Sequence, residues 1–181
     1  MESPSFLFYV LAISLLFSTL LVHEAGHWML LRRWGVSVVR YEIGFGPKFF
    51  KLGCVQVNAL PIGAAVVPQP EAYHSLSAKQ RAWVALAGPL ASFAYAAVIL
   101  VNWPWFDYNP GILKLALLSF YLGLLNLLPV PPLDGFKALE AVIEHRRGPL
   151  SERAKSLCYR AGSGVIYAAG FFLLTKVVFE L

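Results

Sequence analysis

The chain has 181 residues, of which 58% are hydrophobic and only 14% are charged, and its mean hydropathy is +0.63. Soluble domains carry about 25% charged residues, so this composition argues against a soluble protein and favours one that folds in a lipid bilayer. The formal net charge is +5, which raises nucleic acid as a partner, but the positions of the basic residues explain the charge without nucleic acid.

Four apolar stretches approach the roughly 20 residues that a helix needs to cross a hydrocarbon core of about 30 Å. They cover approximately residues 6–31, 80–101, 112–128 and 157–179. The first stretch is too long for a cleaved signal peptide, and the preceding MESPS contains no Lys or Arg, so we expect it to remain in the protein. The sequence therefore predicts a membrane α-helical fold of about four transmembrane helices in a single domain over residues 1–181.

The basic residues are distributed unevenly over the loops. Of the 15 Lys and Arg, 13 lie between the first and second stretches, between the third and fourth, or at the adjoining ends of the second and fourth. Lys114 and Lys176 are left for the other side of the membrane. The positive-inside rule therefore predicts that both chain ends lie outside the cytoplasm.

Residues from about 36 to 67 differ in character from the apolar stretches. VSVVRYEI and VQVNALPIGAAVV have the alternation and the β-branched residues of strands, and the Gly and Pro of GFGPKFFKLG separate them. We predict a small membrane-associated β hairpin or sheet between the first and second transmembrane helices. At membrane depth such backbone is tolerated only where protein or a water-filled cavity surrounds it.

Two further patterns predict packing rather than chemistry. Gly88, Ser92 and Ala96 recur every four residues in the second stretch, and such a stripe of small residues lets another helix approach closely. After the third stretch, Phe136 and Leu139 fall on one helical face and acidic residues fall elsewhere, which predicts a short amphipathic helix at the cytoplasmic interface.

The motif HEAGH lies near the cytoplasmic end of the first stretch. On a helix, His23 and His27 project from the same face and can present two imidazoles to one zinc ion. Glu24 lies beside that face, where it is suited to take a proton from zinc-bound water. Ionisable groups inside an apolar helix are costly and by default functional. The alternative is a cluster without metal that faces a cytoplasmic vestibule or pairs with the arginines after the helix.

A catalytic zinc ion usually has three protein ligands and one water, so a third donor must come from elsewhere. The candidates are His74, Asp107, Asp134 and His145. Asp107 falls on the opposite side of the membrane, and both histidines lie in polar segments. Asp134 closes NLLPVPPLDG at the depth expected for His23, and the prolines of that segment break the helix. Asp134 as the N-cap of the next helix is the alternative interpretation.

These motifs resemble those of the site-2 protease family of intramembrane zinc metalloproteases. HEAGH matches the family's HExxH and NLLPVPPLDG its NxxPxPxLDG, while AGPLASF and the segment from GFGPKFF to LPIGAA agree in order and spacing. The resemblance covers about residues 20–137. It departs at Ala64, where the family often has a second glycine, and at Ser92, where it usually has Asn. The connection NWPWFDYNPG has no room for the PDZ domain of many bacterial members.

The resemblance implies a set of site residues. His23, His27 and Asp134 would bind Zn²⁺, and Glu24 would be the general base. Asn126 would contact the substrate or the developing oxyanion, a role that suits a side-chain amide. The alternative for Asn126 is an interhelical hydrogen bond.

The resemblance also implies an activity, namely hydrolysis of a peptide bond in or near the transmembrane segment of a membrane protein. The expected partners are that substrate and membrane lipid. The expected location is a bacterial inner or plasma membrane, with the active site near the cytoplasmic side. The competing hypothesis is an inactive adaptor that grips transmembrane helices, which the intact Glu24 and histidines disfavour.

Overall fold

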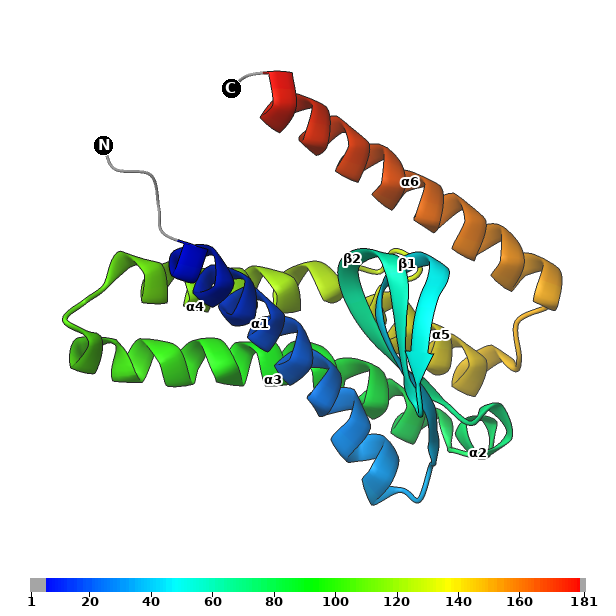
Figure 1. The fold of residues 1–181 in the computed structure, drawn as a ribbon. Coiled ribbons are helices and arrows are strands. Elements are labelled where there is room, and N and C mark those ends of the chain that lie inside the picture. Colours follow the sequence, from blue (N-terminus) through cyan, green and yellow to red (C-terminus); the bar gives the residue numbers. More distant parts are fainter. Residues whose placement is uncertain (1–5, 180–181) are drawn as a thin grey trace.

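The computed structural model describes residues 6–179 and consists of helices around one small sheet (Figure 1). In chain order the elements are α1 (Phe6–Arg33), β1 (Val38–Leu52), β2 (Val55–Pro68), α2 (Pro70–His74), α3 (Ala78–Asn102), the 3₁₀ helix η1 (Trp103–Phe106), α4 (Pro110–Asn126), α5 (Asp134–Arg147) and α6 (Glu152–Phe179). The predicted combination of long helices with a small sheet between the first two of them is confirmed.

The four predicted stretches correspond to α1, α3, α4 and α6, with ends that differ by a few residues. Among the residues that the structure describes, Ala78–Phe106 is the one helical segment long and apolar enough to cross a membrane. Helix α4 is apolar but shorter, because its 17 residues span only about 26 Å. The number of four membrane spans therefore stays a prediction.

Helices α3 and α4 lie side by side, and α1 crosses α3 at an angle (Figure 1). The crossing is close because Gly26 of α1 has no side chain. A Cβ atom at Gly26 would collide with the backbone carbonyl of Ala87 and with the Cβ of Ala91 on α3. The small-residue stripe on α3 is buried, as the sequence predicts.

The two strands build a sheet that is wider than a simple hairpin. Residues 41–43 of β1 pair with residues 64–66 of β2 on one side and with residues 55–57 on the other, while 55–57 also pair with 50–52. The first of these runs is antiparallel, whereas the pairing of 41–43 with 55–57 runs in the same chain direction. Both strands therefore bend back on themselves and form a small mixed sheet of four short segments.

Helix α6 extends away from the bundle (Figure 1). Ion pairs attach its first turn to α5. Lys155 Nζ lies 2.6 Å from Glu144 Oε1 and 3.1 Å from Glu140 Oε1 on α5. Arg81 of α3 contacts the other oxygen of Glu144 at 2.7 Å. The predicted helix after the third stretch is thus confirmed as α5, and its acidic face packs while Leu139 is exposed.

The close crossing of α1 and α3 can be tested with two glycine variants. Gly26→Ala should destabilise the protein by about 1–3 kcal/mol, because the added methyl group overpacks the crossing. Gly164→Ala on α6 is the matched control, since a Cβ there meets no atom of the described part of the chain within 4 Å. Thermal unfolding in detergent measures both, and equal melting temperatures for the two variants would contradict the packing.

Candidate metal centre

Three buried polar side chains meet where α1, α3 and α5 come together. His23 and His27 lie one helical turn apart on α1 and are 4% and 9% exposed. Asp134 is the first residue of α5 and is 3% exposed. Buried polar groups are stable only when other groups satisfy them, so the contacts among these three residues define the site.

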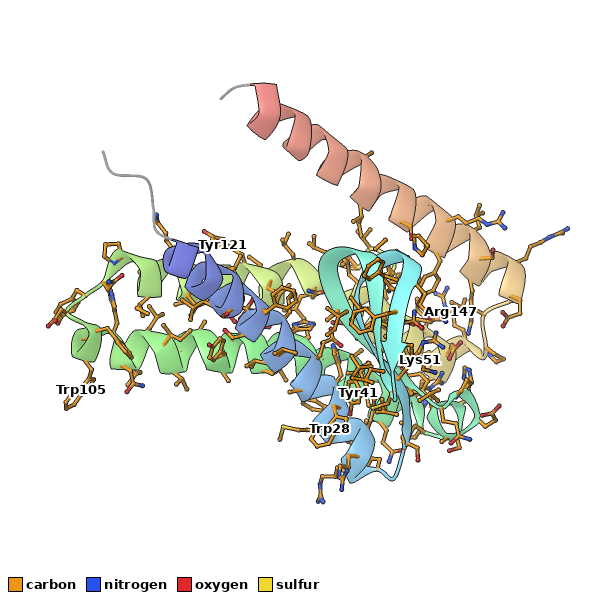
Figure 2. All side chains as sticks on the ribbon, viewed as in Figure 1. Trp28, Tyr41, Lys51, Trp105, Tyr121 and Arg147 are labelled. Atoms are coloured by element: carbon orange, nitrogen blue, oxygen red, sulfur yellow. The ribbon has the colours of Figure 1, made fainter. Side chains whose placement is uncertain are left out.

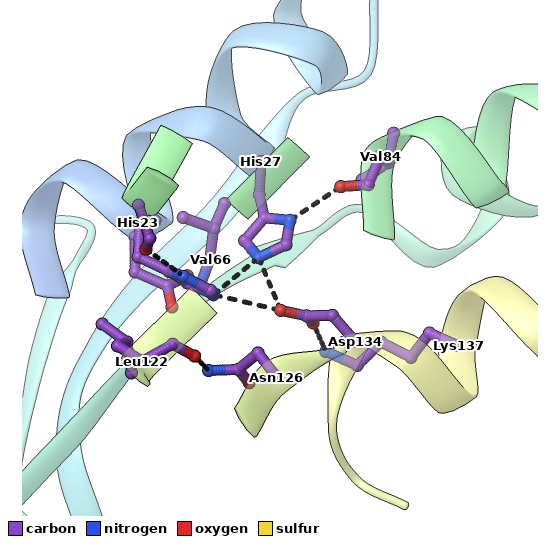
Figure 3. Close-up of polar contacts among 10 residues, drawn as sticks. His23, His27, Val66, Val84, Leu122, Asn126, Asp134 and Lys137 are labelled. Atoms are coloured by element: carbon purple, nitrogen blue, oxygen red, sulfur yellow. Dashed lines mark hydrogen bonds and ion pairs between the residues drawn. The ribbon is translucent and has the colours of Figure 1, made fainter. Parts of the chain in front are cut away.

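The three side chains point their donor atoms at one another (Figure 3). Oδ2 of Asp134 lies 3.0 Å from Nε2 of His23 and 3.1 Å from Nε2 of His27. The two Nε2 atoms are 3.4 Å apart. Four ligands placed about 2.0–2.1 Å from a zinc ion in a tetrahedron lie about 3.3–3.4 Å from each other, so the spacing of the three donors fits such an ion.

The second nitrogen of each ring indicates which atom is free to bind a metal. His27 Nδ1 lies 2.7 Å from the backbone carbonyl of Val84, which can only accept a hydrogen bond. The proton of a neutral His27 therefore sits on Nδ1, and Nε2 presents a lone pair toward Asp134. Facing lone pairs repel unless a cation lies between them, so the chemistry of this donor set also fits a metal ion.

The electrostatics of Asp134 agree with a metal-binding carboxylate. Burial alone would raise its pKa, but the imidazoles of His23 and His27, when they are protonated, and the ammonium of Lys137 hold the pKa well below its usual range. Lys137 Nζ lies 2.8 Å from Oδ1, the oxygen that faces away from the histidines. Asp134 is therefore ionised and keeps Oδ2 for the centre.

Space for the two imidazoles depends on Gly88 of α3. A Cβ atom at this position would collide with Nε2 of His27 and would lie 2.7 Å from Nε2 of His23. One turn further along α3, the hydroxyl of Ser92 lies 2.9 Å from Nδ1 of His23 and is completely buried. Helix α3 thus both makes room for the rings and orients them.

Glu24 lies beside the centre and contacts the sheet. Its Oε2 accepts a hydrogen bond from the backbone N–H of Val66 on β2 at 2.9 Å. Ligand atoms of His23, Glu24 and His27 all lie within 4.8 Å of one another. A carboxylate so placed can reach a water molecule bound at the centre without itself being required as a ligand.

A cavity of about 860 Å³ surrounds these groups. Glu24, Asp134 and residues 63–68 of β2 line it, and Asn126 at the end of α4 lines it as well. Nδ2 of Asn126 donates to the carbonyl of Leu122 in its own helix at 2.9 Å. The structure therefore brings Asn126 to the cavity, and its contact with substrate stays a prediction.

Comparison with known proteins agrees with this geometry. The sequence model of peptidase family M50 matches residues 11–105 and 111–169. The chain belongs to peptidase family M50. A zinc metalloprotease of Methanocaldococcus jannaschii is 28% identical over 148 residues, which cover 80% of this chain and 38% of that protein. The regulator of sigma-E protease of Escherichia coli is 38% identical over 109 residues, which cover 50% of this chain and 24% of that protein.

A solved structure shares the fold of this M50 chain. The site-2 protease from Methanocaldococcus jannaschii aligns with a TM-score of 0.57 and 24% identity, over 96% of this chain and 77% of that one. The chain thus spans well under half the length of the curated relatives described above but most of the solved site-2 protease.

The other donors considered for the M50 site lie elsewhere. His145 is exposed near the end of α5, and Asp107 follows η1, at the end of the bundle where Figure 2 labels Trp105. His74 is exposed and lines the same cavity, but it is not among the three side chains that meet at the centre. Asp134 is not the N-cap of α5, because Leu133 occupies that position. Arg32 is one of the arginines considered as partners of the histidine cluster. Its guanidinium stacks over the ring of Trp28, 5.4 Å from the ring centroid.

Sequence patterns alone did not reveal several residues around the M50 centre. Ser92 was singled out as part of a packing stripe and as a departure from the family's usual Asn, and Lys137 was not singled out at all. The carbonyl of Val84 and the N–H of Val66 are backbone groups, whose partners a side-chain pattern does not show. For Ser92, its position one helical turn after Gly88 in an otherwise apolar stretch is the sequence signal that could have been followed.

Metal binding by the three donors is directly measurable. Asp134→Asn keeps the shape of the side chain but removes its charge, so the purified variant should retain far less zinc than the wild type, which should hold about one ion per chain. His145→Ala removes an exposed histidine and should retain zinc fully. Metal analysis after dialysis measures both, and normal zinc content in Asp134→Asn would exclude this centre.

The contact between Ser92 and His23 predicts a smaller effect. Ser92→Ala should lower zinc affinity by about 10–100-fold, since partners that orient a metal-binding histidine contribute that much. Ser119→Ala is the control, because Ser119 is equally buried but donates to the backbone carbonyl of Ser92 rather than to a histidine. Competition with a chelator measures both affinities; equal losses would show that packing alone is responsible.

Proposed function

We propose that this chain is an intramembrane zinc metalloendopeptidase that hydrolyses a peptide bond in or near the transmembrane segment of a membrane protein. The observation that carries the proposal is the convergence of His23 Nε2, His27 Nε2 and Asp134 Oδ2, with Glu24 beside them, on one buried point that borders a cavity. The relatives described above are named as zinc metalloproteases or as a sigma-E regulatory protease, which supports the same class.

In this proposal His23, His27 and Asp134 hold the zinc ion. When bound, zinc supplies a Lewis acid that polarises the scissile carbonyl and acidifies a water molecule. Glu24 accepts the proton from the attacking water and later delivers it to the leaving amine. The hydrogen bond from the Val66 N–H fixes one oxygen of Glu24 and leaves the other available for this proton. Asn126, which also lines the cavity, contributes a side-chain amide.

The substrate that we propose is a single transmembrane segment that unwinds before cleavage, because helical backbone shields its peptide bonds. Residues 63–68 of β2 line the cavity beside Glu24, and the N–H of Val66 points toward this side rather than toward β1. An extended substrate strand can add along such a strand by backbone hydrogen bonds. Membrane lipid is the second expected partner, and nucleic acid has no role in the proposal.

We further propose a multi-pass topology with four membrane spans in one domain, both chain ends outside the cytoplasm, and a location in the bacterial inner or plasma membrane. The alternation of the basic loops supports this orientation. His27 bonds to Val84, the seventh residue of α3, so the centre lies about 9 Å from the start of that helix, on the side of the basic loops. The proposed centre is thus near the cytoplasmic face.

Glu24→Gln tests the activity. We expect purified Glu24→Gln to cleave a single-span substrate about 10²–10⁴-fold more slowly than the wild type, because the amide cannot take a proton. Its zinc content should stay normal, which separates the general base from the ligands. Chelator should abolish wild-type cleavage, and zinc should restore it.

Glu71→Gln supplies the matched control for the same reaction. Glu71 is an exposed residue of α2, so its change to Gln should leave cleavage intact. Wild-type cleavage no faster than that of Glu24→Gln would contradict the protease hypothesis. It would favour the inactive adaptor, which grips transmembrane helices with the same fold.

A further inference from the structure

The two carboxylate oxygens of Asp134 face different groups. Oδ2 lies between the Nε2 atoms of His23 and His27. Oδ1 accepts a hydrogen bond from Nζ of Lys137, one helical turn further along α5, at 2.8 Å. Figure 3 shows the carboxylate held between the two imidazoles on one side and the lysine on the other. Each oxygen of the carboxylate therefore has different neighbours: Oδ2 faces the two histidines, and Oδ1 faces Lys137.

The helix dipole does not explain the position of Lys137. It is the fourth residue of α5, and a positive charge in the first turn is opposed by the partial positive charge at the start of a helix. An ordinary surface ion pair does not explain it either, because the side chain of Asp134 is 5% exposed while that of Lys137 is 44% exposed. The lysine reaches from the cavity wall to a buried oxygen.

The division of the carboxylate has a consequence for the proposed zinc site. A carboxylate can bind a metal ion through one oxygen or through both, and a second bound oxygen would take the position that the reacting water needs. We propose that Lys137 is a positioning residue that holds Oδ1, so that Asp134 binds the metal through Oδ2 alone and a coordination position stays open. The inference rests on the proposed metal centre but not on any particular substrate.

Cobalt substitution tests this role without relying on cleavage. Co²⁺ replaces zinc in such sites, and its visible absorption is strong in four-coordinate and weak in five-coordinate geometry. We expect Lys137→Met to bind about one Co²⁺ per chain, as the wild type does, but with a clearly weaker visible band. Cleavage by its zinc form should fall by at least about 10-fold. Lys137→Arg should restore the band, because a guanidinium also donates to Oδ1.

Lys79→Met is the matched control, since Lys79 is an exposed lysine in the first turn of α3. Its spectrum and cleavage should equal those of the wild type. Lys137→Gln serves as a second variant if Lys137→Met is not monodisperse in detergent. A wild-type spectrum in the neutral variants, or equal changes in Lys137→Met and Lys137→Arg, would overturn the role.

The same measurements separate this inference from the proposed function. If the wild type binds Co²⁺ but cleaves no substrate, the proteolytic function fails while the spectra still decide the role of Lys137. If the wild type binds neither Co²⁺ nor Zn²⁺, the metal centre itself is wrong and the inference falls with it. Loss of Co²⁺ from Lys137→Met would also overturn it, because the lysine would then be needed for binding rather than for the choice of oxygen.

Discussion

The structure depends on one physical constraint: two imidazole nitrogens and a carboxylate oxygen meet at a buried point, where a cation would satisfy all three. His23 and His27 come from α1, and Asp134 comes from α5, more than 100 residues later in the chain. Helix α3 lies between them and can do so only because Gly88 leaves space for both rings. The packing of the three helices therefore also determines the geometry of the centre.

Groups around the three donors fix how they present their lone pairs. The carbonyl of Val84 and the hydroxyl of Ser92 occupy the Nδ1 atoms of the two histidines, while Lys137 occupies the second oxygen of Asp134. In the low dielectric of a buried site each of these bonds is stronger than in water, and each unpaired group would be costlier. The sheet completes the arrangement, because Val66 bonds to Glu24.

The start of α5 shows how the segment NLLPVPPLDG positions Asp134. Helix α4 ends at Asn126, and the proline-containing segment leads from it to α5. Gly135 lets α5 begin against the backbone carbonyls of Leu127 and Leu128, where a Cβ atom would collide. Ion pairs from Lys155 and from α3 then hold the acidic face of α5 in place. The helix that carries Asp134 is thus held by close backbone contact at its start and by ion pairs further along.

Periodicity and residue type in the sequence were enough to predict the long helices, the β region and the pairing of His23 with His27, because these features depend on local spacing. The depth of the proline-rich segment also singled out Asp134 among the distant donors. Tertiary structure alone decided the partners of Nδ1 in each ring, the contact of Lys137 with Oδ1, and the fold of two strands into four segments. Those contacts join residues that are far apart in the chain or use backbone groups, and no local pattern encodes either of them.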